Sequence, residues 1–211
     1  MSLLHFDGAN NSTTFTDQTG KAWSRVNTPT ISTAQSVYGG ASGLFFSTDY
    51  ITTPDHADWD FGSGDFTLEG RVRPDSTGTA EGLFSKTQVA GGYSPFTLYK
   101  TSAGALQFYM SSNGTSWDIA SGVVLGTIGL GSWYSWAVCR VGGTTLWTFL
   151  DGSGTSTTIP GTAVVTNTEL VALSRHGTVN FYGYMDEFRA TKGVARYTAS
   201  YTPAGSAFPD S

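Results

Sequence analysis

Residues 66–73 read Phe-Thr-Leu-Glu-Gly-Arg-Val-Arg, and residues 133–141 read Trp-Tyr-Ser-Trp-Ala-Val-Cys-Arg-Val. In the first segment, Phe66, Leu68 and Val72 alternate with charged residues, which predicts a strand with apolar and charged side chains on opposite faces. The second segment is almost continuously apolar, as expected of a central strand that is covered on both faces. Together they predict a domain built from β-sheets.

The rest of the chain repeats this pattern. Gly, Ser, Thr, Asn and Asp clusters separate further short strand-like runs at 3–6, 22–26, 43–46, 50–52, 81–86, 96–100, 106–111, 145–150, 169–174 and 181–189. Asp151-Gly152 predicts a tight hairpin turn, and Asn113-Gly114 a second one. Only 56–59 and 192–195 are expected to form single helical turns. Many short strands with frequent turns are typical of an all-β, two-sheet antiparallel β-sandwich.

Composition predicts one domain with a large aromatic core. The chain has 211 residues, only 13% of them charged, with 6 Trp, 10 Tyr and 13 Phe. Trp136, Val138 and Trp147 are expected to be buried between the sheets. No linker or internal repeat interrupts residues 1–211. Pro residues mark 201–211 as an extended C-terminal tail.

Charge and hydropathy exclude several classes of protein. The net charge is −5 and the 11 Lys and Arg residues are scattered, so a nucleic-acid partner is not expected. No apolar run is long enough for membrane insertion. The first residues lack the positive region of a signal peptide, so synthesis and folding in a cytoplasm are expected. A single cysteine, Cys139, cannot form an internal disulfide.

Four ordered motifs give the chain a resemblance to a known family. They are LLHFDG with TTFTD at 3–8 and 13–17, GSGDFTLE at 62–69 after the acidic stretch 55–61, GYMDEFR at 183–189, and KGVARYT at 192–198 closed by Tyr-Thr-Pro at 201–203. Their order and spacing resemble those of laminin-G-like, concanavalin A-like lectin jelly-roll domains of the type encoded by tailed bacteriophages. This resemblance covers essentially the whole chain and implies a concanavalin A-like jelly roll.

The resemblance also implies a function. Such domains are mostly lectin-like or adhesive, and in phages they occur in tail fibres and other exposed virion proteins. The main hypothesis is therefore a non-enzymatic virion structural protein, either a capsid decoration or a tail- or fibre-associated adhesion module. It would be present in multiple copies in the virion, with other virion proteins and host-surface glycans as partners. The alternatives are a free-standing carbohydrate-binding lectin and a remote glycoside hydrolase or lyase.

Calcium is the one cofactor that the sequence suggests. The Asp17 carboxylate and the turn carbonyls up to Gly20 are oxygen ligands of the kind that Ca²⁺ prefers, and Asp186 in the closing strand is their expected partner. Related sequences carry similar acidic residues near the start and the end. The alternative is that Asp17 caps a turn while Asp186 pairs with Arg189 or Arg196.

Sugar binding needs exposed rings beside polar groups, because sugar C–H faces stack on aromatic rings while hydrogen bonds fix their orientation. Trp117, with Asn113 and Asp118, and Tyr93 in the loop after Gly91-Gly92 are the candidate ligand-binding residues. The alternative for Trp117 is packing beneath a loop.

No catalytic residues are predicted. A glycosidase needs two carboxylates across a cleft, and the Glu-x-Asp-x-x-Glu triplet of enzymes with this fold is absent. Asp186 and Glu187 are adjacent, so a regular strand would point them to opposite faces. His5, His56 and His176 lie near no nucleophile motif and are expected to be surface or structural residues.

Overall fold

The computed structural model describes residues 1–46, 48–76, 78–86 and 93–210, which form two antiparallel sheets. The first sheet contains, in spatial order, β13 (Ser153–Thr158), β12 (Thr145–Leu150), β11 (Tyr134–Val141), β6 (Phe66–Pro74), β17 (Gly183–Lys192), β4 (Ser42–Phe45) and β3 (Thr30–Ser32), with β1 (Ser2–Leu4) also paired to β17. The second contains β10 (Ala120–Thr127), β9 (Ala105–Met110), β8 (Phe96–Lys100), β7 (Glu81–Lys86), β14 (Val171–Leu173), β5 (Tyr50–Thr53) and β2 (Ser24–Val26).

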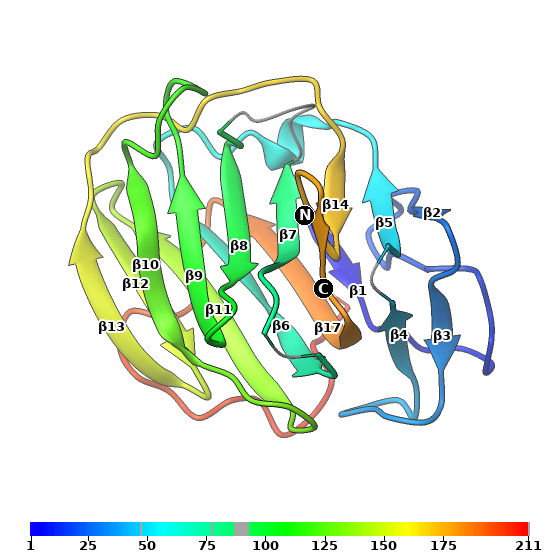
Figure 1. Ribbon diagram of the computed structural model, residues 1–211. Coiled ribbons are helices and arrows are strands. Elements are labelled where there is room, and N and C mark those ends of the chain that lie inside the picture. Colours follow the sequence, from blue (N-terminus) through cyan, green and yellow to red (C-terminus); the bar gives the residue numbers. More distant parts are fainter. Residues whose placement is uncertain (47, 77, 87–92, 211) are drawn as a thin grey trace.

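The two sheets lie face to face, as Figure 1 shows with the second sheet in front. A short hairpin of β15 (Arg175–His176) and β16 (Val179–Asn180) lies outside them. The predicted turn at 56–59 is confirmed as a single 3₁₀ turn, η1 (Ala57–Trp59). The predicted turn at 192–195 is wrong, because Lys192 still belongs to β17. The fold is the predicted all-β antiparallel sandwich.

Three strands of the two large sheets escaped prediction for identifiable reasons, as did the two-residue strands β15 and β16. β13 is made almost entirely of Ser, Thr and Gly, and β3 has only three residues. β10 contains two glycines and register shifts against β9, so its apolar residues do not alternate. The Asp151-Gly152 turn is confirmed, since both residues have positive φ and join β12 to β13. Asn113-Gly114 instead lies within a longer loop between β9 and β10.

Aromatic side chains fill the space between the sheets. Phe84 stacks on Phe96 with ring centroids 5.2 Å apart and also contacts Phe188 at 4.9 Å. Trp136 and Val138 are buried in this core, as predicted. Trp136 lies opposite Gly70 of β6, where an added Cβ would come within 3.2 Å of the indole. The core therefore depends on a glycine that makes room for the largest side chain of β11.

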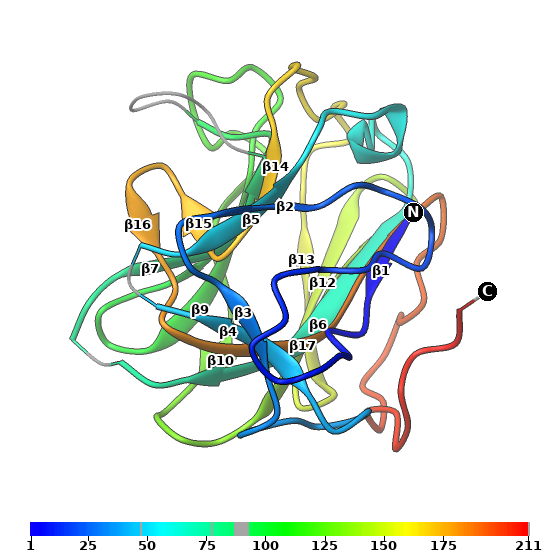
Figure 2. The same cartoon turned by 90° about the vertical axis from the view of Figure 1, so that its right-hand side faces the viewer.

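The prediction that Trp147 lies between the sheets is wrong. Trp147 pairs with Cys139 across β11 and β12, and its side chain is half-buried in a second cluster on the outer face of the first sheet. This cluster also contains Phe149, and the stacked rings of Tyr197 and Tyr201, 3.7 Å apart, cover it. Those tyrosines belong to the C-terminal segment, which runs along this face in Figure 2.

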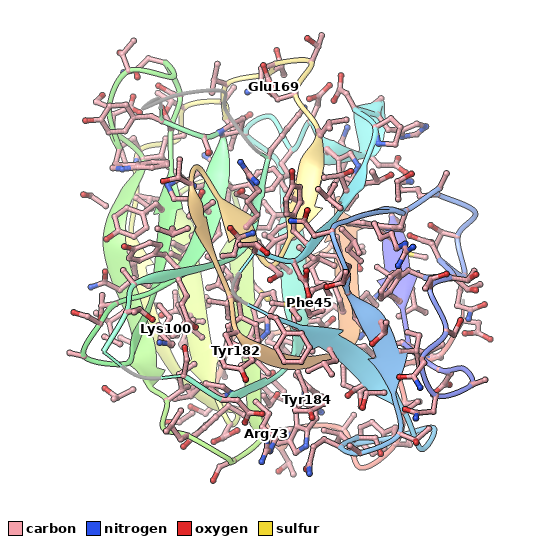
Figure 3. All side chains as sticks on the ribbon, turned by 45° about the vertical axis from the view of Figure 1, so that its right-hand side comes forward. Phe45, Arg73, Lys100, Glu169, Tyr182 and Tyr184 are labelled. Atoms are coloured by element: carbon pink, nitrogen blue, oxygen red, sulfur yellow. The ribbon has the colours of Figure 1, made fainter. Side chains whose placement is uncertain are left out.

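The charged face of β6 is covered as well. Glu69 is 1% exposed, and Arg71 is buried with its guanidinium near Ser135 Oγ and the Ala204 carbonyl. Only the end of this face remains accessible, where Arg73 lies over the Tyr184 ring at 5.4 Å (Figure 3). The alternation in 66–73 therefore separates two buried environments, one between the sheets and one beneath the C-terminal segment.

Replacing Trp136 with Ala is expected to lower the free energy of unfolding by about 3–5 kcal/mol, through lost burial and a residual cavity. Urea unfolding followed by fluorescence and circular dichroism measures the loss. Trp147→Ala is the matched control and should cost clearly less, because Trp147 is only half-buried. A loss below about 1 kcal/mol for Trp136→Ala would contradict the packing described here.

Candidate aromatic binding surface

The outer face of the second sheet carries a connected group of rings, which we call the aromatic surface: Tyr93, Tyr99, Tyr109, Trp117 and His176. Four of them form a closed circuit, with centroid separations of 5.2 Å for Trp117–Tyr109, 6.3 Å for Tyr109–Tyr99, 6.1 Å for Tyr99–His176 and 6.2 Å for His176–Trp117. Tyr93 joins it edge-on to Trp117 at 5.1 Å. All five residues are half-buried, so the group as a whole is partly exposed to solvent.

Strand alternation positions the first two rings. Leu98 of β8 and Phe108 of β9 are opposite one another and point into the core. Their neighbours Tyr99 and Tyr109 therefore point outward, on diagonal positions of the same ladder. The Tyr109 hydroxyl donates to the Gln107 side-chain oxygen at 2.8 Å. Figure 1 shows β8, β9 and β10 with this outer face toward the viewer.

The loop between β9 and β10 positions Trp117. The Asn113 side-chain oxygen accepts hydrogen bonds from the backbone N–H groups of Thr115 and Ser116, at 2.8 and 2.9 Å. The Asp118 carboxylate accepts from the Ser112 N–H at 2.8 Å and from the Ser112 hydroxyl. Slight desolvation opposes ionisation of the exposed Asp118 carboxylate, but these hydrogen bonds outweigh it and hold the pKa below its usual value. Asn113 and Asp118 thus organise the loop that presents Trp117.

The structure brings the four predicted ligand-binding residues together and gives them different roles. Tyr93 and Trp117 contact one another, while Asp118 supports Trp117 from the adjacent position. The predicted glycine loop at 91–92 lies outside the described residues. Tyr99, Tyr109 and His176 were not predicted as site residues. Outward alternation within 96–100 and 106–111 would have found the two tyrosines, but no local pattern places His176 beside them.

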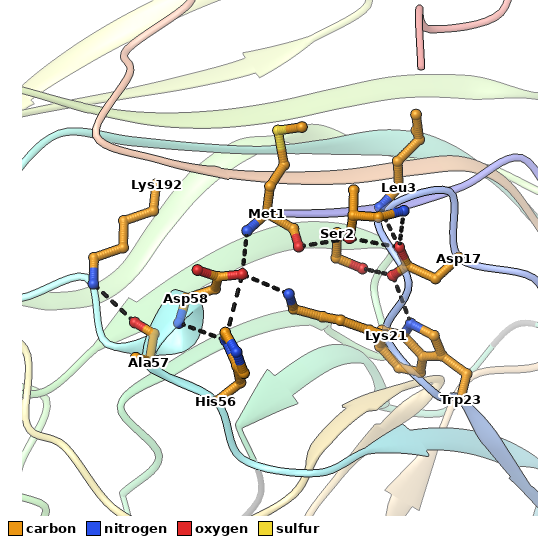
Figure 4. A network of polar contacts seen from close by, with 11 residues as sticks. Met1, Ser2, Leu3, Asp17, Lys21, Trp23, His56, Ala57, Asp58 and Lys192 are labelled. Atoms are coloured by element: carbon orange, nitrogen blue, oxygen red, sulfur yellow. Dashed lines mark hydrogen bonds and ion pairs between the residues drawn. The ribbon is translucent and has the colours of Figure 1, made fainter. Parts of the chain in front are cut away.

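Asp17, the first predicted calcium ligand, is surrounded by donors of the protein itself (Figure 4). One carboxylate oxygen accepts from the Ser2 hydroxyl at 2.5 Å and the Trp23 indole at 3.0 Å. The other accepts from the Thr19 N–H and hydroxyl, each at 2.7 Å. Asp17 therefore caps a turn, as the alternative prediction stated, and ties it to β1. Gly20 lies in this turn with a φ of 86°.

Asp186, the second predicted ligand, has a different set of partners. Its Oδ2 accepts from the backbone N–H groups of Val37 and Tyr38, at 2.7 and 3.2 Å. Its Oδ1 is buried without a hydrogen-bond partner in the described residues. Burial, together with the charge of Glu187, raises the pKa of Asp186 to about 7 despite the two backbone hydrogen bonds.

The alternative pairing of Asp186 with an arginine is wrong. Arg189 and Arg196 both contact Glu69 instead, at 2.8 and 3.7 Å. The expectation of opposite faces for Asp186 and Glu187 also fails, because β17 bulges between Asp186 and Arg189 and Glu187 has a φ of 52°. Among the described residues, no group of three or more His, Cys, Asp or Glu side chains is placed to hold a metal ion. The calcium site stays a prediction.

Two further buried acids, Glu187 and Glu81, are held by other protein groups. Glu187 accepts from the Phe208 N–H at 2.6 Å and contacts His5 at 2.7 Å, and Glu81 lies 3.4 Å from the Lys100 ammonium. Burial lowers the pKa of His5, but hydrogen bonds to Asp210 and Glu187 outweigh it, so the net shift is upward.

In the part of the chain that the structure describes, no helix has the length and apolar character needed to cross a membrane.

Solved structures with the same fold include several binding domains. The binding domain of Paraclostridial Mosquitocidal Protein 1 matches with a TM-score of 0.67 and 13% identity, covering 90% of this chain and 49% of that chain. The botulinum neurotoxin serotype G binding domain matches at 0.65 and 11%, covering 92% and 48%. This chain thus spans about half the length of those domains. Domain 4 of AbnA, a GH43 extracellular arabinanase from Geobacillus stearothermophilus solved in complex with arabinotriose, matches at 0.66 and 16%, with 92% of both chains covered.

These likenesses define the fold, a two-sheet antiparallel jelly roll. A family model described as the concanavalin A-like lectin/glucanases superfamily, of the Laminin_G_3 type, matches residues 45–195. The chain belongs to this family. A comparison with the sequences of curated proteins gave no match.

Asp186→Asn is expected to stabilise the protein above about pH 7. A carboxylate whose folded pKa is raised favours folding at low pH and loses that contribution as the pH rises from its unfolded value to the folded pKa of about 7. The Asn side chain keeps an acceptor for Val37 and Tyr38 and carries no buried charge. Thermal melts between about pH 4 and pH 9 should therefore show a flatter pH dependence for the variant than for the unaltered protein.

The same melts with added calcium or chelator test the metal prediction. Calcium bound by Asp186 should raise the melting temperature of the unaltered protein and not that of Asp186→Asn. Equal melting temperatures in calcium and in chelator would contradict the calcium site. A pH dependence that Asp186→Asn leaves unchanged would contradict the raised pKa.

Proposed function

We propose that the chain is a non-enzymatic glycan-binding domain that holds a sugar on the aromatic surface. The observation that carries this proposal is the closed circuit of Trp117, Tyr109, Tyr99 and His176 on the outer face of the second sheet. Rings in this arrangement present apolar faces and edges at fixed angles to the same volume of solvent. A pyranose or furanose ring offers C–H groups to such surfaces and hydroxyls to the polar groups beside them.

The charges around the aromatic surface favour neutral glycans. Asp118 is exposed beside Trp117, and the guanidinium of Arg175 is stacked over the Tyr50 ring at 4.3 Å. The chain as a whole carries a net charge of −5. A glycan rich in carboxylates or sulfates would be repelled by Asp118 and by the net charge, whereas a neutral one meets rings and hydrogen-bonding groups.

The comparisons support this proposal through the fold. One structural neighbour is a domain of an arabinanase in complex with arabinotriose, and others are toxin binding domains, one of them in complex with SialylT. At 9–16% identity these likenesses concern architecture, so the sugar-binding residues proposed here rest on the geometry of this chain. The carboxylates of Glu69, Glu81 and Glu187, engaged by other protein groups, favour binding over hydrolysis.

We further propose that the domain acts on a phage particle, as a capsid decoration or a tail-associated adhesion module. The support is the resemblance of its motifs to those of phage-encoded jelly rolls. Many copies on one particle would turn weak individual binding into firm attachment, because linked sites raise the effective concentration. Purified particles should then contain the chain in stoichiometric amounts, and its deletion should reduce adsorption to host cells. Particles that lack the chain would contradict this role.

Trp117→Ala is expected to weaken glycan binding by about 2 kcal/mol or more, roughly 30-fold in Kd, because a central Trp carries much of the energy of such contacts. A glycan array followed by calorimetry with the best-bound glycan measures the change. Trp133→Ala is the matched control, since Trp133 is also half-buried but lies near Tyr184 by the first sheet, with ring centroids 6.5 Å apart. Equal weakening by both variants would contradict the assignment to the aromatic surface.

A further inference from the structure

The position of His176 is set by an unusually close contact between the β15–β16 hairpin and β7. A Cβ added at Gly82 of β7 would lie 2.2 Å from the backbone nitrogen of His176 and 2.5 Å from its Cβ. Further along β7, the Ser85 hydroxyl donates a hydrogen bond to the Arg175 carbonyl at 2.7 Å. The Asn180 amide donates to the Ser174 carbonyl at 3.1 Å and closes the hairpin. The backbone that carries His176 is therefore fixed on the sheet.

The imidazole itself is fixed on one side only. Its Nδ1 lies 3.0 Å from the Thr97 hydroxyl of β8, and its ring packs edge-on to Tyr99 with an interplanar angle of 86°. Nε2 forms no hydrogen bond with any described residue. The His176 residue as a whole is half-buried on the outer face of the second sheet. A polar ring atom that lies beside Tyr99 and Trp117 and bonds no described residue suits the hydroxyl of a bound sugar.

We infer that His176 is the specificity-determining residue of the aromatic surface and that its neutral imidazole presents Nε2 to a hydroxyl of a sugar ring packed on Trp117. This inference rests on the proposed glycan-binding function. The Thr97 hydroxyl both donates and accepts, so it fits either neutral tautomer of the ring. Nε2 therefore accepts from, or donates to, a sugar hydroxyl, which also does both.

Protonation of His176 opposes this binding. Burial lowers the pKa of His176 below its usual value of 6.5, so the ring is neutral at neutral pH. The titratable and charged groups on the described elements around it are Glu81 and Lys86 of β7, Tyr99 and Lys100 of β8, Tyr109 of β9, Asp118 of the loop before β10 and Arg175 of its own hairpin. A sugar that covers a charged imidazolium strips its hydration and, where Nε2 is the acceptor, loses the hydrogen bond as well.

The test is a pH series of calorimetric titrations with arabinotriose, maltotriose, cellotriose and chitotriose, from about pH 8 to pH 5. The unaltered protein is expected to bind at least one of them about 3–10-fold more weakly at the acidic end, the loss that corresponds to one hydrogen bond. His176→Gln should bind with a Kd that does not follow the titration of an imidazole. His56→Gln is the matched control, because His56 is 58% exposed beside η1 and should leave the pH profile unchanged.

A second variant keeps the test decisive if His176→Gln unfolds. Thr97→Val removes the hydroxyl that orients Nδ1 at nearly constant volume, so it should weaken binding at neutral pH while the melting curve shows a folded protein. The inference would be overturned if Trp117→Ala abolished binding while His176→Gln and Thr97→Val left both the affinity and its pH profile unchanged. That result would leave the proposed glycan-binding function standing. An unaltered protein that binds none of the four trisaccharides would overturn both.

Discussion

The carboxylate of Glu69 is the buried charge around which the first sheet and the C-terminal segment are arranged. It lies in the middle of β6 and accepts hydrogen bonds from Arg189 Nε at 2.9 Å and from the Tyr197 hydroxyl at 2.8 Å. A buried carboxylate without such partners would cost several kcal/mol, and removing one partner leaves the charge uncompensated. β6 can therefore occupy the centre of the sheet only if β17 lies beside it and the C-terminal segment lies over it. Burial and the nearby Glu69 charge raise the pKa of Tyr197 well above its usual value, so this hydroxyl stays a donor.

This arrangement makes the two outer faces of the sandwich different. The outer face of the first sheet is occupied by the C-terminal segment, whose Phe208 ring lies 4.0 Å from the Arg189 guanidinium. In the part of the chain that the structure describes, the outer face of the second sheet carries the short β15–β16 hairpin and the loop that presents Trp117. A large ligand would therefore contact the rings of the aromatic surface on the second sheet, whereas the C-terminal segment covers the outer face of the first sheet. The asymmetry follows from where the buried charge lies, and it places the aromatic surface on the second sheet.

The sequence predicted the fold because its strongest motifs are the ones that build the interior. Glu69 stands in GSGDFTLE, Arg189 in GYMDEFR, and Arg196 and Tyr197 in KGVARYT. The structure brings the other three residues to the Glu69 carboxylate. Such motifs identify a family through its architecture and carry no direct information about a ligand. The weak strands β3, β10 and β13 were missed because Ser, Thr and Gly give no periodicity, and they form because neighbouring strands offer unpaired backbone groups.

The candidate site was predictable only in part, because it is assembled from distant segments. Trp117 and Tyr93 stood out as aromatic residues in loops, and the structure places them together. The pair of Thr97 and His176 is separated by 79 residues, and its geometry depends on the contact between the hairpin and Gly82. A glycine in a strand ordinarily weakens it, since it loses more backbone entropy than other residues and packs no side chain. At Gly82 that cost has a local reason: any larger residue would push the hairpin away from β7 and carry His176 out of reach of Tyr99 and Trp117. The same missing side chain therefore serves the packing of the fold and the shape of the site.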